Sequence, residues 1–291
     1  MTQKLRIASA QYPIDFVGDW PTYRHKIGAW VEKAAANQAQ LLLFPEYFSM
    51  ELASLFPAAV YRSLPGQLEA MQTLVYDFIA LFQELAAKHR LHIVAGTLPV
   101  RQADGSYRNR CYWFFPDGHR EYQDKLQMTR FENERWGISG GDAITLFETP
   151  FGKAAVSVCY DSEFPLIARR QVEAGADLIL VPSCTDTLAG FHRVQIGSRA
   201  RALENQCYVV QSSTVGVADW SEAVDINHGA AAVYTPADYG FPDTGILVTG
   251  ALNQPQWVYA DLDPVALRDV RLNGQVYNYR DWDGQLRFGA T

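Results

Sequence analysis

Three residues with complementary chemistry each stand at the end of a short run that predicts a β-strand. Cys159 comes after KAAVSV, Glu46 comes after LLLFP, and Lys125 ends the run REYQDK. A carboxylate can take the proton of a thiol, a thiolate can attack an amide or nitrile carbon, and an ammonium can stabilise the negative charge that develops. These residue types therefore indicate hydrolysis through a cysteine nucleophile, if the fold brings the three side chains together.

Alternating strands and helices surround these residues along the chain. Short apolar runs predict strands at residues 5–11, 41–44, 91–97, 153–158, 177–181, 207–212, 230–234 and 256–262. Amphipathic periodicity predicts helices from residue 21, over 68–89, 166–173 and 195–205, and after the capping pair Asp263-Pro264. Asp117-Gly118 predicts the turn of a hairpin between CYWFF and REYQDK. We expect an α/β or mixed layered architecture with one domain over residues 1–291, including a C-terminal extension from about residue 265.

The position of Cys159 suggests one way in which its thiol could be activated. It lies at the carboxyl end of a predicted strand, where open α/β sheets place their sites, and a predicted helix begins a few residues later. The positive end of that helix is expected to lower the pKa of the thiol, whereas Asp161 and Glu163 act in the opposite direction. A separate base is therefore required. We assign Asp161 and Glu163 to local structure and to the charge at the start of the helix.

Composition argues against several classes of function. The formal net charge of −7 does not favour a nucleic-acid or anionic-membrane surface. No run approaches the roughly 18 apolar residues that a membrane span requires, and we expect no export signal. The four cysteines form no CxxC pair and the six histidines are scattered, so no metal site is expected. The cysteine usage favours a reducing compartment, and we expect a cytoplasmic protein.

Three stretches in a fixed order carry a resemblance to a known family. FPEY at 44–47, DKL at 124–126 and VCYDSEFP at 158–165 are similar to the signature stretches of the nitrilase superfamily of carbon-nitrogen hydrolases. The opening LRIASAQYP and the segment RARALENQCYVV at 199–210 also resemble that family, so the likeness spans roughly residues 4–265. The resemblance implies a four-layer α-β-β-α sandwich with two sheets packed between helices. It also implies at least a homodimer, for which the helix over 166–173 is the candidate interface; Arg169 and Arg170 on that helix could equally face solvent.

The resemblance implies a catalytic cycle without a metal or an organic cofactor. Glu46 is expected to deprotonate Cys159, and Lys125 together with the backbone N–H of Tyr160 is expected to hold the oxyanion. Ammonia or an amine leaves, and Glu46 activates the water that hydrolyses the thioester. The family has a second glutamate after the lysine, for which Glu132 fits the spacing better than Glu134.

Substrate preference is the least determined feature of the sequence. Aromatic residues near the strand ends and the segment 182–193 are expected to line the pocket. The residues expected to contact substrate are Tyr47, Phe131, Trp136, Tyr160, Cys184, Thr185 and His192. Arg193 could meet an anionic group. Glu163 stands where many members of the family have a basic residue, so it could shift the substrate preference.

Several functions remain open at this point. An amidase acting on a small aliphatic or ω-amido acid amide ranks first, ahead of a nitrilase and an N-carbamoyl amide hydrolase with the same three residues. A catalytically silent binding protein of the same fold is an alternative from another class. A Cys–His thiol hydrolase would require a histidine near Cys159, and His228 is the candidate. We expect a small-molecule amide or nitrile substrate, and neither a nucleic acid nor a membrane as partner.

Overall fold

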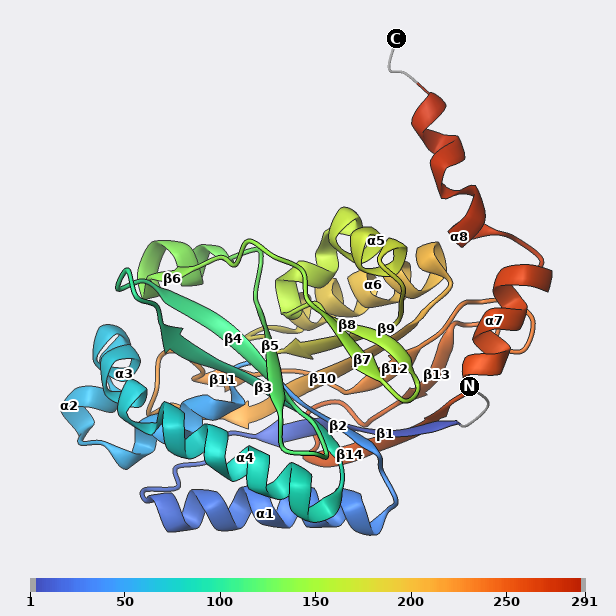
Figure 1. Cartoon of the computed structure of the whole chain (residues 1–291). Helices are drawn as coiled ribbons and strands as arrows, with labels where there is room; N and C mark the ends of the chain where they lie inside the picture. Colours follow the sequence, from blue (N-terminus) through green and yellow to red (C-terminus); the bar gives the residue numbers. More distant parts are fainter. Residues whose placement is uncertain (1–3, 289–291) are drawn as a thin grey trace.

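A large mixed sheet forms the centre of the protein (Figure 1). The computed structural model describes residues 4–288. The main path of the sheet runs in the order β5-β4-β3-β2-β1-β10-β9-β8-β7, with β14 paired to β1. The strands are β1 (Leu5–Pro13), β2 (Leu41–Phe44), β3 (His92–Arg101), β4 (Tyr107–Phe114), β5 (Arg120–Asp124), β6 (Ile138–Ser139), β7 (Leu146–Thr149), β8 (Gly152–Val156), β9 (Ala176–Ser183), β10 (Tyr208–Val217), β11 (Ile226–Asn227), β12 (Ala232–Tyr234), β13 (Ile246–Thr249) and β14 (Gln256–Leu262).

The sheet folds back on itself, so that its two halves pack face to face. The rings of Trp113 on β4 and Phe147 on β7 are stacked with their centroids 4.7 Å apart, although these strands lie near opposite ends of the strand order. Side chains alternate along each strand, so one strand can contribute apolar residues to a core on each of its two faces. On β2, Leu41 and Leu43 belong to the core that includes Trp113 and Phe147, whereas Leu42 and Phe44 face the other core.

Helices cover both outer faces of the folded sheet. In Figure 1, α1 (Trp20–Ala36) and α4 (Val75–His89) lie below the strands, and α5 (Pro165–Glu173) and α6 (Leu188–Asn205) lie above them. The apolar sides of α1 and α4 pack in one core, and those of α5 and α6 contribute to the other. This arrangement confirms the expected four-layer α-β-β-α sandwich.

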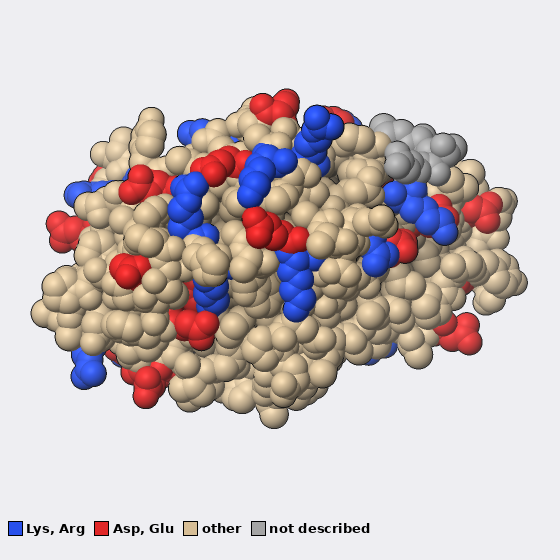
Figure 2. Space-filling model, turned by 90° about the horizontal axis from the view of Figure 1, so that it is seen from below, with Lys and Arg blue, Asp and Glu red and all other residues tan. Residues whose placement is uncertain are grey.

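The outer surface of α1 and α4 carries charges of both signs. Basic and acidic side chains are intermingled on the face seen from below in Figure 2. Two ion pairs, Arg24–Glu84 and Lys88–Glu32, join the two helices at 2.7 and 3.1 Å. Such exposed pairs contribute little to stability because solvent screens them. The packing of the helices on the sheet therefore depends on their buried apolar residues.

The shorter helices show where the sequence predictions need adjustment. The single helix predicted over 68–89 is wrong, because α3 (Leu64–Met71) and α4 are separated by a 3-10 turn at Gln72–Leu74. The Gln72 side chain accepts a hydrogen bond from Arg101 N and donates to Pro99 O, so this turn is joined to β3. The remaining short elements are η1 (Phe48–Leu55), α2 (Ala58–Tyr61), the π-helical turn η3 (Phe131–Trp136) and the 3-10 turn η4 (Cys159–Glu163).

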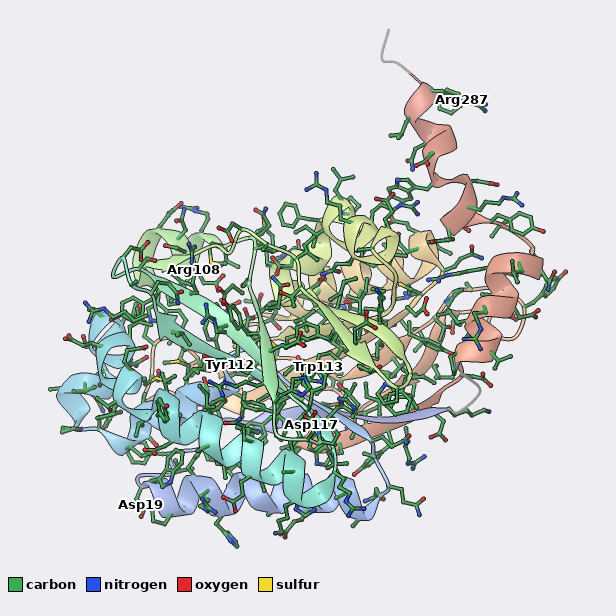
Figure 3. All side chains as sticks on the ribbon, in the orientation of Figure 1. Asp19, Arg108, Tyr112, Trp113, Asp117 and Arg287 are labelled. Atoms are coloured by element: carbon green, nitrogen blue, oxygen red, sulfur yellow. The ribbon has the colours of Figure 1, made fainter. Side chains whose placement is uncertain are left out.

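Helix caps agree with the sequence. Asp19 accepts a hydrogen bond from Thr22 N at the start of α1 (Figure 3), and Asp263 accepts from Val265 N and Ala266 N at the start of α7 (Pro264–Asn273). Beyond α7, the segment with α8 (Asn278–Asp281) and η5 (Trp282–Arg287) projects from the body of the protein, and Arg287 lies near its far end. Within residues 4–288, no helix combines the length and apolar character that a membrane span needs.

Candidate active site

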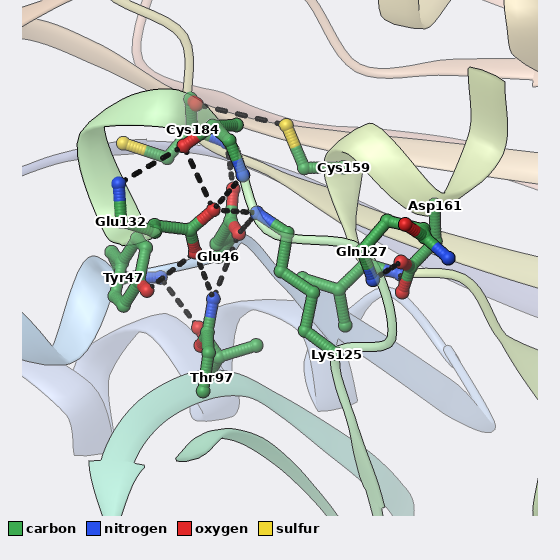
Figure 4. Close-up of polar contacts among 12 residues, drawn as sticks. Glu46, Tyr47, Thr97, Lys125, Gln127, Glu132, Cys159, Asp161 and Cys184 are labelled. Carbon is green, nitrogen blue, oxygen red and sulfur yellow. Dashed lines mark hydrogen bonds and ion pairs between the residues drawn. The ribbon is translucent and has the colours of Figure 1, made fainter. Parts of the chain in front are cut away.

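Strand ends bring the three predicted residues into one buried cluster. Glu46 lies two residues beyond β2, Lys125 comes directly after β5, and Cys159 begins η4 just beyond β8. The three side chains are 1–5% exposed, although they come from both halves of the folded sheet. Figure 4 shows the lysine side chain reaching toward the two glutamates, with the cysteine beside them.

Cys159 and the residue that follows Glu46 have unusual backbone geometry. Cys159 has a φ of +48° and Tyr47, next to Glu46, has a φ of +54°, both in the left-handed region that side chains other than glycine rarely adopt. Gly96 on β3 lies against this turn with a φ of +51°, and a Cβ at that position would lie 2.0 Å from Pro45 O. The strain at Cys159 and Tyr47 is typical of residues that a fold holds for function.

The ammonium of Lys125 lies between two carboxylates. Its Nζ donates to Glu46 Oε1 at 2.8 Å and to Glu132 Oε2 at 2.7 Å. Asn109 Nδ2 donates to Glu46 Oε1 at 2.9 Å and to Glu132 Oε1 at 3.2 Å, which joins the carboxylates from another side. A buried ammonium is stabilised only by such pairing, so this arrangement fixes the position and the charge of Lys125.

Glu132, rather than Glu134, belongs to this cluster. The π-helical turn directs Glu132 inward, where its carboxylate also accepts from Tyr47 Oη at 2.7 Å and from Thr129 N and Oγ1 at 2.9 Å. Glu134 is exposed and pairs with Arg130 at 2.9 Å. The sequence analysis did not predict this π-helical turn.

The thiol of Cys159 lies near the Glu46 side chain and the backbone at Cys184, which directly follows β9. Cys159 Sγ donates to Cys184 O at 3.7 Å, and the charge of Glu46 acts on the pKa of the thiol. Cys184 N donates to Glu46 Oε2 at 3.1 Å. The backbone at Cys184 therefore contacts both partners and sets the position of the thiol relative to the carboxylate.

Burial and charge determine the protonation states in the cluster. Burial raises the pKa of Glu46 above its ordinary value, while the Lys125 ammonium lowers it and the Glu132 charge raises it further. For Glu132, burial is outweighed by the Lys125 charge and by several hydrogen bonds, so its pKa is lowered. For Lys125, burial is likewise outweighed, here by both carboxylates, and its pKa is raised well above the usual range. The cluster thus contains a fixed cation, a fixed anion and a second carboxylate that binds protons more readily.

The pKa of the Cys159 thiol is opposite to the sequence prediction. Burial, and then the Glu46 charge, raise this pKa well above its ordinary value, and the Lys125 ammonium only partly opposes them. The helix α5 begins at Pro165, close to where the sequence predicted it, so the raised pKa of the thiol comes from burial and not from a misplaced helix. The thiol is therefore protonated at rest and needs a neighbouring base to react.

Asp161 connects the lysine segment to the cysteine segment. Its carboxylate accepts hydrogen bonds from Leu126 N, Gln127 N and Val158 N at 2.7–3.2 Å (Figure 4). Burial raises its pKa to about 7, and the Lys125 charge and these bonds oppose that rise. The assignment of Asp161 to local structure fits its bond from Val158 N, but it missed that Leu126 and Gln127 lie about 35 residues away along the chain.

Comparisons with known proteins identify the family of this chain. The profile of the carbon-nitrogen hydrolase family matches residues 6–271. The chain belongs to this family. A probable hydrolase, YhcX, of Bacillus subtilis is 35% identical over 95% of this chain, and the match covers 53% of that protein, so this chain spans about half of its length. Omega-amidase NIT2 of Danio rerio is 29% identical, with 83% of this chain and 82% of that protein covered.

Solved structures show the same fold. A carbon-nitrogen hydrolase from Helicobacter pylori G27 superposes with a TM-score of 0.78 at 18% identity, over 99% of this chain and 96% of that chain. Nit3 of Saccharomyces cerevisiae, a nitrilase superfamily member, gives 0.73 at 23% identity, over 94% and 96%. These likenesses show the fold alone, and the comparisons leave the substrate of this family member open.

In this carbon-nitrogen hydrolase, a cavity of about 540 Å³ opens onto Cys159, Glu46 and Lys125. Its lining includes six of the seven residues expected to contact substrate, which are Tyr47, Phe131, Trp136, Tyr160, Cys184 and Thr185. His192 is exposed, pairs with Gln195 and does not line the cavity. The lining also contains residues 222–226. The sequence did not indicate them, because they are distant along the chain from the strand ends that carry Glu46, Lys125 and Cys159. His228 does not line the cavity either, and its Nδ1 lies 3.1 Å from Asn253 Nδ2.

Proposed function

We propose that this hydrolase is an amidase in which Cys159 is the nucleophile, Glu46 the general base and Lys125 the electrophilic stabiliser. The observation that carries the proposal is the buried ammonium held between two carboxylates beside a thiol, in the lining of one cavity. Such a cluster provides a base for the thiol and a fixed positive charge for an oxyanion in one place.

The proposed cycle begins with proton transfer from Cys159 Sγ to Glu46. The sulfur forms a bond to the amide carbon, and the carbonyl oxygen acquires a negative charge that Lys125 and the backbone N–H of Tyr160 stabilise. The carbon–nitrogen bond then breaks, and Glu46 returns its proton to the leaving amine. A water molecule loses a proton to Glu46 and attacks the thioester, which releases the carboxylic acid and restores the thiol.

The protonation states in the cluster support these roles. Because the pKa of Glu46 is raised and that of Glu132 is lowered, the proton of the thiol moves to Glu46, while Glu132 stays ionised beside Lys125. Glu132 is proposed as a positioning residue that holds the lysine. This pairing of two carboxylates with separated pKa values is a common way to divide such tasks.

Amide hydrolysis is preferred to the alternatives because of the relatives. Several proteins named omega-amidase are 24–29% identical to this chain over at least 83% of its length. Nitriles and N-carbamoyl amides would use the same three residues, so a substrate panel must separate them. The proposal of a catalytically silent protein is disfavoured by the intact cluster.

The test is ammonia release from short amides, nitriles and carbamoyl amino acids by the reduced protein. We expect release from amides, and we expect Cys159→Ala to abolish it without changing the thermal unfolding temperature by more than a few degrees. Activity that persists in Cys159→Ala would contradict the assignment of the nucleophile. A folded wild-type protein that is inactive on the whole panel would favour the silent binding protein.

We also propose that the protein forms a homodimer through α5 and α6. Leu166 on α5 and Ile196 on α6 are 64% and 65% exposed, so these packed helices present apolar side chains to solvent. Arg169, which the sequence analysis left open as an interface or a solvent-facing residue, is buried within the protein. Its guanidinium donates to Tyr279 O of the C-terminal segment. Sedimentation should show a dimer that Leu166→Asp weakens, whereas Tyr76→Asp on the opposite face of the protein should leave it intact.

A further inference from the structure

An asparagine that no step of the proposed cycle uses lies inside the catalytic cluster. Asn109 is on β4 between Arg108 and Arg110, and because side chains alternate along a strand, these two partly exposed arginines leave Asn109 facing the interior. Its side chain is 0% exposed. Its backbone carbonyl accepts a hydrogen bond from Lys125 N at 2.9 Å, so β4 also fixes the start of the lysine segment.

The two ends of the Asn109 amide have different surroundings. The NH₂ group has two hydrogens, and Nδ2 donates to Glu46 Oε1 at 2.9 Å and to Glu132 Oε1 at 3.2 Å. The amide oxygen is buried and accepts from no donor within residues 4–288. Such an unsatisfied acceptor lowers stability. The protein therefore keeps an unfavourable buried amide at a position where its NH₂ group bridges the two carboxylates.

The two oxygens of Glu46 also differ from each other. Oε1 accepts from Asn109 Nδ2 and from Lys125 Nζ, which together occupy both of its lone pairs. Among the residues that the structure describes, Oε2 accepts only from Cys184 N, at 3.1 Å. The carbonyl of the same Cys184 accepts from Cys159 Sγ at 3.7 Å. Oε2 is therefore the oxygen that shares a neighbour with the thiol, and it keeps a lone pair for a proton.

We propose that Asn109 is a positioning residue of this amidase, which directs the proton of Cys159 to Oε2 of Glu46. The proposal rests on the proposed amidase function and adds a residue and an atom to its first step. The S–H bond breaks, the proton forms an O–H bond at Oε2, and the sulfur keeps the electron pair with which it attacks the amide carbon. Oε1 stays bound to Lys125 and Asn109 during this step, so the carboxyl group keeps its orientation.

Asn109 also acts on the charge of Glu46. A hydrogen bond donated to a carboxylate favours its ionised form, which is the form that acts as a base. The titratable groups that act on Glu46 from the surrounding elements are Lys125, Glu132, Tyr47, Cys111, Cys159 and Cys184. Burial raises the pKa of the tyrosine and of the three thiols, so only the lysine and the second glutamate are charged near neutral pH. Substitution of the neutral Asn109 leaves both of these charges in place.

The test replaces Asn109 with leucine, which has a similar size but no donor. Loss of the donor should raise the pKa of Glu46, so the acid limb of kcat/KM for ammonia release should move to higher pH, by about one pH unit. On the plateau, kcat/KM should fall about tenfold, mainly through kcat, because the carboxyl group is less well oriented. Asn109→Ala removes the same donor without adding bulk, and it should move the limb in the same direction if leucine prevents folding.

Asn205 provides a matched control. It is also 0% exposed, its Nδ2 donates to Arg201 O at 3.1 Å on α6, and its amide oxygen likewise has no donor among the described residues. Asn205→Leu should therefore lower the free energy of unfolding, as Asn109→Leu does, but leave the acid limb unchanged. A limb that does not move in folded Asn109→Leu, or that moves equally in Asn205→Leu, overturns the positioning role.

A second readout separates this proposal from the amidase function. Alkylation of Cys159 by iodoacetamide, followed by mass spectrometry of its peptide, requires loss of the same thiol proton but no amide hydrolysis. We expect the acid limb of the alkylation rate to move to higher pH in Asn109→Leu as well. A wild-type protein that releases ammonia from no amide contradicts the amidase function, and the alkylation profile then decides the role of Asn109. An alkylation limb that is the same in wild type and Asn109→Leu overturns that role.

Discussion

Replacing Glu132 with Gln tests whether this residue positions Lys125. The carboxylate has five hydrogen bonds: Oε1 accepts from Tyr47 and Asn109, and Oε2 accepts from Lys125 and twice from Thr129. A Gln side chain can place its oxygen toward Lys125 and Thr129. Its NH₂ group then faces Tyr47 Oη, which can rotate to accept, and Asn109 Nδ2, which cannot.

The expected loss follows from these contacts. The lysine exchanges a charged acceptor for a neutral one, and one buried donor faces another, which together cost about 2–4 kcal/mol. Displacement of Lys125 is expected to cost a comparable amount of oxyanion stabilisation. Removal of one oxyanion donor typically lowers kcat by about 10²–10³-fold. We therefore expect Glu132→Gln to lower kcat/KM by about a hundredfold and to lower the free energy of unfolding measurably.

The assay is ammonia release as a function of pH, together with chemical denaturation. Since the Glu132 charge raises the pKa of Glu46, its removal should move the acid limb of kcat/KM to lower pH. Glu134→Gln is the matched control, because it removes the same charge from an exposed neighbour paired only with Arg130, and it should change kcat/KM less than about twofold. An unmoved acid limb with near-normal kcat/KM in Glu132→Gln would refute the positioning role.

Three further predictions concern other parts of the site. The acid limb of wild-type kcat/KM should lie above the pKa of an ordinary glutamate, because Glu46 must be ionised to act and its folded-state pKa is raised; a limb at or below the ordinary value would contradict this base. Asp161→Asn should lower kcat by at least about tenfold, since its NH₂ would face backbone donors that hold Lys125 near Cys159, and a stable variant with normal kcat would exclude that link. Gly96→Ala should lower the unfolding free energy by several kcal/mol, measured by denaturant titration, because the added Cβ meets Pro45 O at 2.0 Å.

The sequence led to Glu46, Lys125 and Cys159 through two observations: each follows a locally recognisable strand, and the stretches around them resemble the family's signatures. β2 was predicted with its observed bounds, and the hairpin that ends at Lys125 was also correct. The contacts that tune these residues were not predictable, since they join distant segments. Asn109 is paired with both glutamates from the middle of the chain, and nothing in its local sequence indicates a polar residue facing a carboxylate.

Two departures from the sequence interpretation have the same physical origin, which is burial. The thiol of Cys159 was expected to have a lowered pKa from a nearby helix, but removal from water dominates the observed shift. Arg169 could have faced solvent from its helical position alone, yet the C-terminal segment covers it, with its guanidinium 4.9 Å from the centre of the Trp282 ring. Neither effect can be derived from the local sequence, because both depend on segments that are distant along the chain and contact these residues only in the folded protein.

The raised pKa of the thiol has a consequence for how the site selects its substrate. A free thiolate would react with many electrophiles, whereas a buried thiol beside Glu46 becomes nucleophilic only when the proton moves to the base as attack proceeds. In the proposed cycle, Lys125 would stabilise the charge of the oxyanion only if the carbonyl is correctly placed, and the cavity wall would determine that placement.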